Sequence, residues 1–380
     1  MTSRIGRFAR IDWTFLLAAL GATGLGLFYL SSASPTAFGA QIKWVAPAVL
    51  GFCMALSIGY WRLVPASPVL YAGVLSLLVL VLGLPARRGA HSWIDLPGFS
   101  IQPSEMAKIA IVLVLAHVLA NNHKQVFTLR GLVAPVLLGM IPTALILKQP
   151  DLGSAMILPP TLFIMLFASG ARKTHLACAL VIGVLLVIPM WTHVMKDYQK
   201  RRIEAFIQPE RYEAQEAYQL IMSLIAIGSG GVSGKGWQEG TYNTLGLLPD
   251  RHTDFIFGVI AEEGGFIRAG LLILMYLLLA LCGLNIAAQT EDPVGRLVAV
   301  GGTSLICVQA FINIAVVTAL LPTTGITLPL VSYGGSSLLA SFIIIGLVMS
   351  VQLKPRPMFG YRESFRGREG AHEREEETNA

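Results

Sequence analysis

The stretch FIRAGLLILMYLLLALCGLNI, residues 266–286, decides the class of fold. Apart from Arg268 it carries no charged side chain, and it has the length of about 20 residues that an α-helix needs to cross a bilayer. Because a soluble core cannot bury so much apolar surface, the sequence predicts an all-α, polytopic membrane protein with about ten transmembrane helices. The other apolar runs lie at roughly 12–31, 44–61, 67–84, 104–121, 132–148, 154–170, 175–194, 297–320 and 333–353.

The composition of the chain excludes several other classes of protein. Of the 380 residues, 54% are hydrophobic and only 13% are charged, far below the ~25% charged residues of soluble domains. The net charge is +6, but no basic domain lies outside the apolar runs, so we expect no nucleic-acid partner. The four cysteines lie inside apolar runs, where a free thiol packs as a small hydrophobe, and no Cys or His spacing predicts a metal site.

Lysine and arginine in the short loops predict the orientation, because cytoplasmic loops carry an excess of both. With the N-terminus inside, the short outer loops hold only Lys43, Arg87, Arg88 and Lys148. An even number of spans then places both termini in the cytoplasm. No clear cleavage site follows the first span, so we interpret it as a retained anchor. Besides the basic start of the tail, the cytoplasmic side then holds Arg4, Arg7, Arg10, Arg62, Lys124, Arg130, Arg172, Lys173 and Arg296.

The domain organisation predicted from this pattern is simple. Residues 1–353 form one membrane domain with a single large extracytoplasmic loop at about 195–265. Residues 354–380 begin basic and end acidic, which is typical of a disordered cytoplasmic tail whose start contacts anionic membrane lipids.

Elements rich in Pro and Gly recur at the predicted outer ends of the spans, at 84–105, 148–154 and 320–337. Irregular backbone at that depth persists only where protein or water satisfies its polar groups. Together with the loop 195–265, these elements favour a cavity that opens to the outer side. The alternative is that Pro and Gly merely end the helices.

Three charged residues near these elements are candidates for the site. Glu105 and Lys108 are three residues apart at the start of a span, so they share one helix face. A purely structural Lys108 would reach outward to the interface or pair with Glu105. Asp151 lies between two spans, and its structural alternative is an N-cap of the second one.

The segment 251–257 holds a further carboxylate, Asp254, next to aromatic and aliphatic side chains. We expect residues 253–263 to form a short helix at the outer surface, with Asp254 at the membrane boundary. A carboxylate in that place suits a proton acceptor. The alternative is an N-cap of the short helix, a role for which Thr253 competes. Arg251 and His252 precede it and are candidates for substrate contacts.

Basic residues in the large loop suit an anionic group. Arg can clamp phosphate oxygens with two hydrogen bonds, although the alternative is ordinary interfacial anchoring. The Gly-rich stretch GSGGVSGKGW, residues 228–237, is not a P-loop but could offer backbone N–H groups to an anion. The residues alone therefore support an outward-facing membrane site for an anionic lipid or solute. The basic candidates are Lys196, Lys200, Arg201, Arg202 and Lys235.

Six motifs together resemble the SEDS family (shape, elongation, division and sporulation), in its RodA-like branch. In the order of that family, they are IQPSEMAK (101–108), KQPDLGS (148–154), HVMKDYQKRRI (193–203), AYQLIMSLIAIGSGGVSGKG (217–236), LPDRHTDFIFGVIAEE (248–263) and LPLVSYGGSS (328–337).

The resemblance implies a peptidoglycan glycosyltransferase of the bacterial cytoplasmic (inner) membrane, with its active site facing the periplasm. Such an enzyme polymerises lipid II into a growing glycan strand beside a class B penicillin-binding protein and other membrane proteins of the elongation complex. The resemblance also implies that Asp254 is catalytic and that Glu105, Lys108 and Asp151 are functional. No cofactor is implied, and a divalent cation at the diphosphate is left open.

The chemistry of this reaction agrees with the residues. A diphosphate leaves readily once cations neutralise it, whereas an attacking sugar hydroxyl needs a base. Two alternatives are a flippase or transporter of the same lipid, which does not need Asp254 as a base, and a non-catalytic scaffold. The chain departs from the family pattern at Met222, Tyr242 and Arg268, which puts polar contacts at the first two positions in doubt.

Overall fold

The computed structural model describes residues 12–84, 92–96, 99–121, 128–189, 191–192, 195–212 and 217–353. The predicted tail and the basic residues Arg4, Arg7, Arg10, Arg87, Arg88 and Lys124 lie outside these ranges. The long helices are α2 (Trp13–Ala33), α3 (Pro35–Ile58), α5 (Ser67–Val81), α6 (Pro103–Asn121), α7 (Leu129–Lys148), α8 (Leu152–Ala168), α9 (Lys173–Pro189), α13 (Ile256–Ala288), α14 (Pro293–Val317) and α15 (Gly335–Leu353).

The prediction of an all-α membrane fold is confirmed. Each of the ten predicted apolar runs coincides with one of these helices, and 7 of the helices are long and apolar enough to cross a membrane. The helices α5, α8 and α9 are apolar but shorter, so the exact number of crossings remains a prediction. The sequence did not predict the small antiparallel hairpin of β1 (Ile94–Leu96) and β2 (Phe99–Ile101).

Local capping explains where the first helices begin. The Asp12 side chain accepts a hydrogen bond from the Phe15 N–H at the start of α2, and Ser34 does the same for Ala37 at the start of α3. Since Pro35 fits the first helical position, α3 begins directly after α2. The predicted second span began only at residue 44, so Lys43 lies within α3 and not in a loop.

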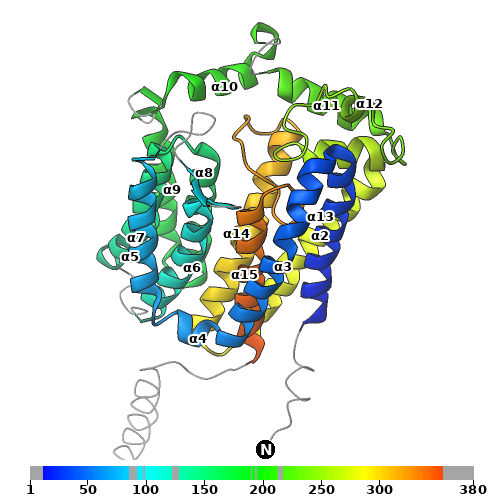
Figure 1. Cartoon of the computed structure of the whole chain (residues 1–380). Coiled ribbons are helices and arrows are strands. Elements are labelled where there is room, and N and C mark those ends of the chain that lie inside the picture. The colour runs from blue at the N-terminus through cyan, green and yellow to red at the C-terminus, as the bar shows by residue number, and fades with distance from the viewer. Residues whose placement is uncertain are drawn as a thin grey trace, which may run out of the picture.

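Helix α14 is at the centre of the molecule and packs against α6, α8, α13 and α15 (Figure 1). It therefore joins two groups of helices, one of α2, α3 and α13 and the other of α5 to α9. The start of α2 and the end of α15 lie at the same end of the molecule. The elements of the large loop lie across the opposite end.

The large loop is more structured than its polar sequence suggests. It contains α10 (Asp197–Ile207), the short η2 (Pro209–Arg211), α11 (Tyr218–Gly230) and α12 (Thr241–Thr244). Helix α11 is apolar and packs on the first part of α13. Helix α13 begins at Ile256, so the predicted short helix is its first segment.

A break in α13 ends that first segment at Gly265, whose backbone angles are φ 67° and ψ −172°. The Gly-rich stretch packs against the break. Its amides at Lys235 and Gly236 donate to the carbonyls of Glu262 and Glu263, at 3.1 Å each. These amides are thus engaged within the protein, and the expectation that they bind an anion is wrong for them.

We expect Gly265→Ala to destabilise the protein by about 1–3 kcal/mol, because a side chain rarely adopts this backbone conformation. In addition, a Cβ at residue 265 would lie only 2.2 Å from the Gly234 nitrogen. Thermal unfolding of the detergent-solubilised protein measures the effect. Gly270→Ala, on the same helix, is the control, because nothing lies within 4 Å of a Cβ there. Equal melting temperatures for the two variants would contradict this account of the break.

Candidate functional site

The segment between α14 and α15, residues 318–334, is irregular and largely buried, and we call it the α14–α15 segment. Buried backbone polar groups must find partners, and here side chains of other helices supply many of them. Tyr276 of α13 donates to the Pro329 carbonyl, and Gln41 of α3 bonds to both Ser332 and Gly334. The sequence predicted irregular backbone whose polar groups are satisfied by protein, and this segment is such backbone; its location on the outer side stays a prediction.

The α14–α15 segment and α14 together fix the main chain at Asp254. Three successive carbonyls, of residues 252 to 254, each accept a hydrogen bond. Their donors are the Tyr333 N–H at 2.9 Å, the Ser332 Oγ at 2.5 Å and the Asn313 Nδ2 at 2.8 Å. The N-cap position of α13 is Phe255, with no side-chain cap. The alternative that Asp254 or Thr253 caps the helix is therefore wrong.

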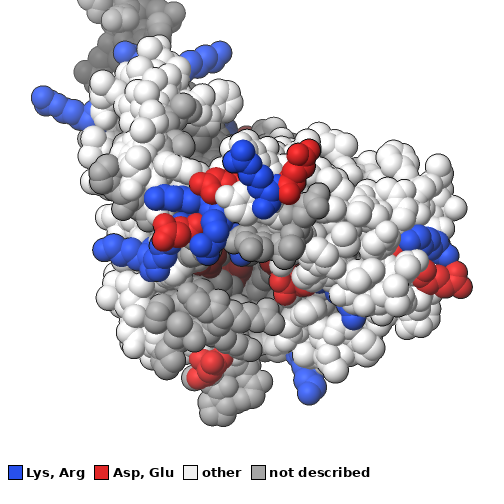
Figure 2. All heavy atoms as spheres, turned by 90° about the horizontal axis from the view of Figure 1, so that it is seen from above, with Lys and Arg blue, Asp and Glu red and all other residues white. Residues whose placement is uncertain are grey.

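The Asp254 side chain is half-buried and lines a small cavity that is open to solvent. A Cβ placed on Gly325 would lie 3.7 Å from Asp254 Oδ2 and 3.9 Å from Arg202 Nη1. Both groups therefore face the same small space, beside a residue that has no side chain. Figure 2 shows this face of the molecule, with acidic and basic side chains gathered around a hollow. The cavity is also lined by Gln219, Asp250, Thr323 and Thr324.

One buried polar atom of this cavity has no partner among the described residues. Thr324 is only 4% exposed, and its Oγ1 makes no hydrogen bond there. A buried hydroxyl without a partner is uncommon in native structures and calls for an explanation. A polar group of a bound ligand would supply the missing hydrogen bond.

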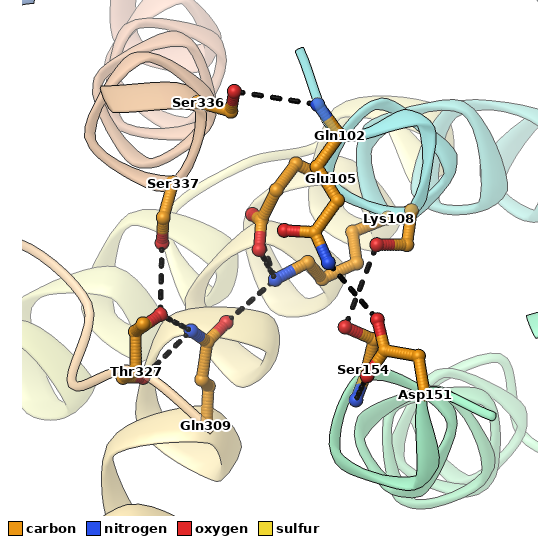
Figure 3. A network of polar contacts seen from close by, with 10 residues as sticks. Gln102, Glu105, Lys108, Asp151, Ser154, Gln309, Thr327, Ser336 and Ser337 are labelled. Atoms are coloured by element: carbon orange, nitrogen blue, oxygen red, sulfur yellow. Dashed lines mark hydrogen bonds and ion pairs between the residues drawn. The ribbon is translucent and has the colours of Figure 1, made fainter. Parts of the chain in front are cut away.

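A second polar cluster surrounds Lys108 (Figure 3). Lys108 is 3% exposed and Glu105 is 6% exposed, and their charged groups are 2.8 Å apart. The Lys108 ammonium also donates to Gln309 Oε1 at 2.8 Å. Lys108 therefore does not reach outward to the membrane interface, and the alternative of pairing with Glu105 describes its geometry correctly.

Asp151 joins this cluster from α8. Its Oδ1 accepts from the Ser154 N–H at 3.0 Å, which makes it the predicted N-cap. Its Oδ2 accepts from Gln102 Nε2 at 2.9 Å, so the cap also connects α8 to the start of α6. Gln102 in turn donates its N–H to Ser336 Oγ at 3.4 Å, at the start of α15. Sequence elements from 101–108, 148–154 and 320–337 thus meet in one place.

A second small cavity lies between α6 and α15. Gln102, Glu105 and Ser336 supply its polar lining. The remaining lining is mostly aliphatic. These residues are Ile101, Met106, Ile109, Leu339, Ala340 and Ile343.

Three other predicted site residues, Arg251, His252 and Lys235, line neither of the two cavities. Arg251 donates to the carbonyls of Ala33 and Asn243 and so ties the loop to α2. The ring of His252 lies 6.0 Å from that of Tyr333. Lys235 pairs with the buried Glu262 at 2.7 Å.

The basic residues at the start of α10 differ in their exposure and in what they contact. Lys196 and Arg201 are exposed and Lys200 is half-buried, whereas Arg202 lines the Asp254 cavity and lies 3.5 Å from the Thr323 carbonyl. Of this cluster, Arg202 is thus the residue that the structure brings together with Asp254.

Several residues of the two clusters were missed in the sequence. Gln309 and Asn313 are four apart inside the apolar run 297–320, and polar side chains within a membrane span are rare unless they have a role. That signal could have identified both. No comparable signal marked Gln102 or Thr324, which lie among other polar residues. Within the described ranges, no group of three or more His, Cys, Asp or Glu side chains could hold a metal ion.

None of the three departures from the family pattern lines the Asp254 cavity. Tyr242 donates its N–H to Glu262 at 2.9 Å, and its ring lies 5.1 Å from the Lys235 ammonium. Met222 of α11 packs against the core, and Arg268 is exposed on α13.

Comparisons with known proteins give one consistent picture. The family model for cell cycle proteins of the FtsW, RodA and SpoVE type matches residues 14–356. The chain is 37% identical to the probable peptidoglycan glycosyltransferase FtsW of Geobacter metallireducens, over 91% of this chain and 95% of that protein.

Two solved structures resemble the fold. One comes from a study of the structural coordination of polymerization and crosslinking by a peptidoglycan synthase complex. It has a TM-score of 0.79 and 30% identity, and the match covers 90% of this chain and 97% of that one. The other is the rod shape determining protein RodA of Thermus thermophilus, with a TM-score of 0.69 and 28% identity, covering 92% and 98%.

Proposed function

The chain belongs to the FtsW, RodA and SpoVE family of cell cycle proteins, and on this premise we propose that it is a peptidoglycan glycosyltransferase that polymerises lipid II. The observation that carries the proposal is the open cavity in which a carboxylate, Asp254, and a guanidinium, Arg202, face one space. A glycosyl transfer needs one base and one cationic site, and this cavity offers both.

In the proposed reaction, Asp254 takes the proton of the acceptor sugar hydroxyl as its oxygen attacks the anomeric carbon of the donor. The bond from that carbon to the diphosphate oxygen breaks, and the electron pair leaves with undecaprenyl diphosphate. The configuration at the anomeric carbon is inverted, because attack and departure occur on opposite sides. In this proposal, Arg202 and Lys108 are the cations that stabilise the negative charge of the leaving diphosphate.

A divalent cation at the diphosphate remains part of the proposal. Asp250 and Asp254 are the carboxylates that line the cavity, and carboxylates with phosphate oxygens are the ligands that Mg²⁺ prefers.

The second cavity supports a lipid-linked substrate. Its aliphatic lining lies between two helices of the membrane domain, and its polar lining includes Glu105, which pairs with Lys108. We propose that a polyprenyl chain packs against these aliphatic residues, with its diphosphate towards the Lys108 cluster. This arrangement would also serve a flippase, which is the second candidate function; a non-catalytic scaffold needs neither cavity.

We further propose that the enzyme acts in cell elongation, at the outer face of the bacterial cytoplasmic membrane, beside a class B penicillin-binding protein. The likeness to RodA and the RodA-like stretch at 228–237 support elongation, whereas the relative quoted above is named FtsW. The likeness to a synthase complex of polymerization and crosslinking supports a transpeptidase partner.

The direct test is to incubate the purified protein with lipid II, alone and with a cognate transpeptidase, and to assay for glycan polymer. We expect polymer from the wild type. Absence of polymer in both incubations, with translocation of lipid II in vesicles, would favour the flippase. Absence of both activities would leave the scaffold.

We expect the large loop to face the periplasm. In a variant without its native cysteines, Glu239→Cys should react with a membrane-impermeant thiol reagent added to intact spheroplasts. Thr174→Cys, at the start of α9, should react only after the membrane is opened. Both positions are exposed in the structure. The reverse labelling pattern would contradict the orientation and the periplasmic site together.

A further inference from the structure

Two amide side chains on α14 lie between the Lys108 cluster and the Asp254 cavity. Gln309 is 5% exposed and Asn313 is 1% exposed. Since they are four residues apart on one helix, they project from the same face. Each contacts both a candidate site residue and the α14–α15 segment.

Gln309 connects Lys108 to this segment (Figure 3). Its Oε1 accepts from the Lys108 ammonium at 2.8 Å, and its Nε2 donates to the Thr327 carbonyl at 2.9 Å. An ammonium can only donate and a carbonyl can only accept, so the two contacts need opposite ends of one amide. Neither a carboxylate nor an aliphatic side chain can make both.

Asn313 makes a similar connection one turn along the helix. Its Nδ2 donates to the carbonyl of Asp254 at 2.8 Å and to that of Ile326 at 2.6 Å. The two segment carbonyls are therefore neighbours in sequence, at residues 326 and 327. One face of α14 thus connects the main chain at Asp254 and the ammonium of Lys108 to two successive peptide groups of the α14–α15 segment.

We propose that Gln309 and Asn313 are positioning residues that set the distance between Lys108 and Asp254. The inference rests on the proposed function, in which Lys108 binds the lipid diphosphate and Asp254 accepts the proton. Gln309 then acts through substrate binding, and Asn313 acts through the chemical step. A misplacement of about 1 Å at a reacting group can cost on the order of 10²-fold in rate.

This division of roles gives a kinetic test, because loss of binding raises KM whereas loss of a transition-state interaction lowers kcat. Gln309→Met and Asn313→Leu keep the approximate shapes of the side chains and remove their hydrogen bonds. Polymerisation of lipid II by the full-length protein is followed with substrate concentration varied, and thermal unfolding is measured beside it. Ser304→Ala is the matched control, since Ser304 is a buried polar residue of α14 that bonds only to the Gly301 carbonyl in the described structure.

We expect Gln309→Met to raise KM at least about tenfold with kcat little changed, and Asn313→Leu to lower kcat at least about tenfold with KM little changed. Ser304→Ala should change neither. If either variant fails to fold, Gln309→Glu or Asn313→Asp replaces it, since each keeps the shape of the side chain but exchanges the amide donors for a carboxylate. Gln309→Glu keeps an acceptor for Lys108 but loses the donor to the Thr327 carbonyl, so it should also raise KM.

Equal changes of kcat and KM in both variants would overturn the proposal, because a general collapse of the α14–α15 segment would act on both parameters. Wild-type kinetics in both variants would also overturn it. If the wild type makes no polymer, the proposed function fails, and the positioning role is judged by lipid II binding alone. In that case Gln309→Met should weaken binding and Asn313→Leu should not.

Discussion

Asp254→Asn should lower the polymerisation of lipid II by about 10²–10⁴-fold, the range typical of the loss of a general base. Asn has nearly the shape of Asp and keeps one hydrogen-bonding oxygen, but it cannot accept the proton. The three carbonyl contacts that hold residues 252 to 254 belong to the main chain, so the fold should not change. Glycan polymer made by the purified protein in a fixed time measures the effect.

Two further measurements on Asp254→Asn separate loss of the base from loss of the site. Lipid II should still bind, because Lys108 and Arg202 are untouched, and the complex with the transpeptidase should persist. If the protein is instead a flippase, Asp254→Asn should translocate lipid II almost as well as the wild type. Retention of more than about a tenth of wild-type polymerisation would end the case for Asp254 as the base.

Lys108→Met should abolish detectable polymerisation for two reasons that must be separated. The substitution removes a cation from the site, and it also leaves Glu105 buried without its partner. Breaking a buried ion pair in this way costs on the order of 3–5 kcal/mol of stability. The single variant should therefore lose both activity and melting temperature.

The double variant Glu105→Gln with Lys108→Met separates the two effects. Replacing both partners by uncharged residues of similar volume leaves no uncompensated buried charge, which is what destabilises the single variant. We expect this protein to reach normal levels in the membrane and to unfold near the wild-type temperature while it stays inactive. Full activity of the stable double variant would show that the pair serves the fold alone.

The sequence predicted the helices well because crossing a bilayer imposes a length and a composition that each segment shows by itself. It did not predict that α3 begins at Pro35 or that α11 is an apolar helix within the large loop. A start at Pro35 depends on the Ser34 cap, and α11 depends on packing against α13. Both are tertiary or local details that apolar run lengths do not record.

For the site, the sequence identified the charged groups but not what holds them. A helix cap was the alternative to a catalytic role for Asp254, with Thr253 as a competitor. The structure instead holds the carbonyls of both residues through side chains more than fifty positions away. Lys235 stood in a stretch that suggested an anion site, and it pairs with Glu262. Which cation faces a cavity and which pairs internally depends on contacts between segments that are remote in the chain.

The contacts that hold Asp254 also impose an order on biosynthesis. All three donors to the carbonyls of residues 252 to 254 come from residues 313 to 333, which leave the ribosome well after the acidic residue they support. A nascent chain that ends after α13 already has most of its membrane-crossing helices, yet it lacks every one of these donors. Premature termination in this gene would thus produce an inserted protein with no assembled centre, and the completed enzyme forms only as the final two helices arrive.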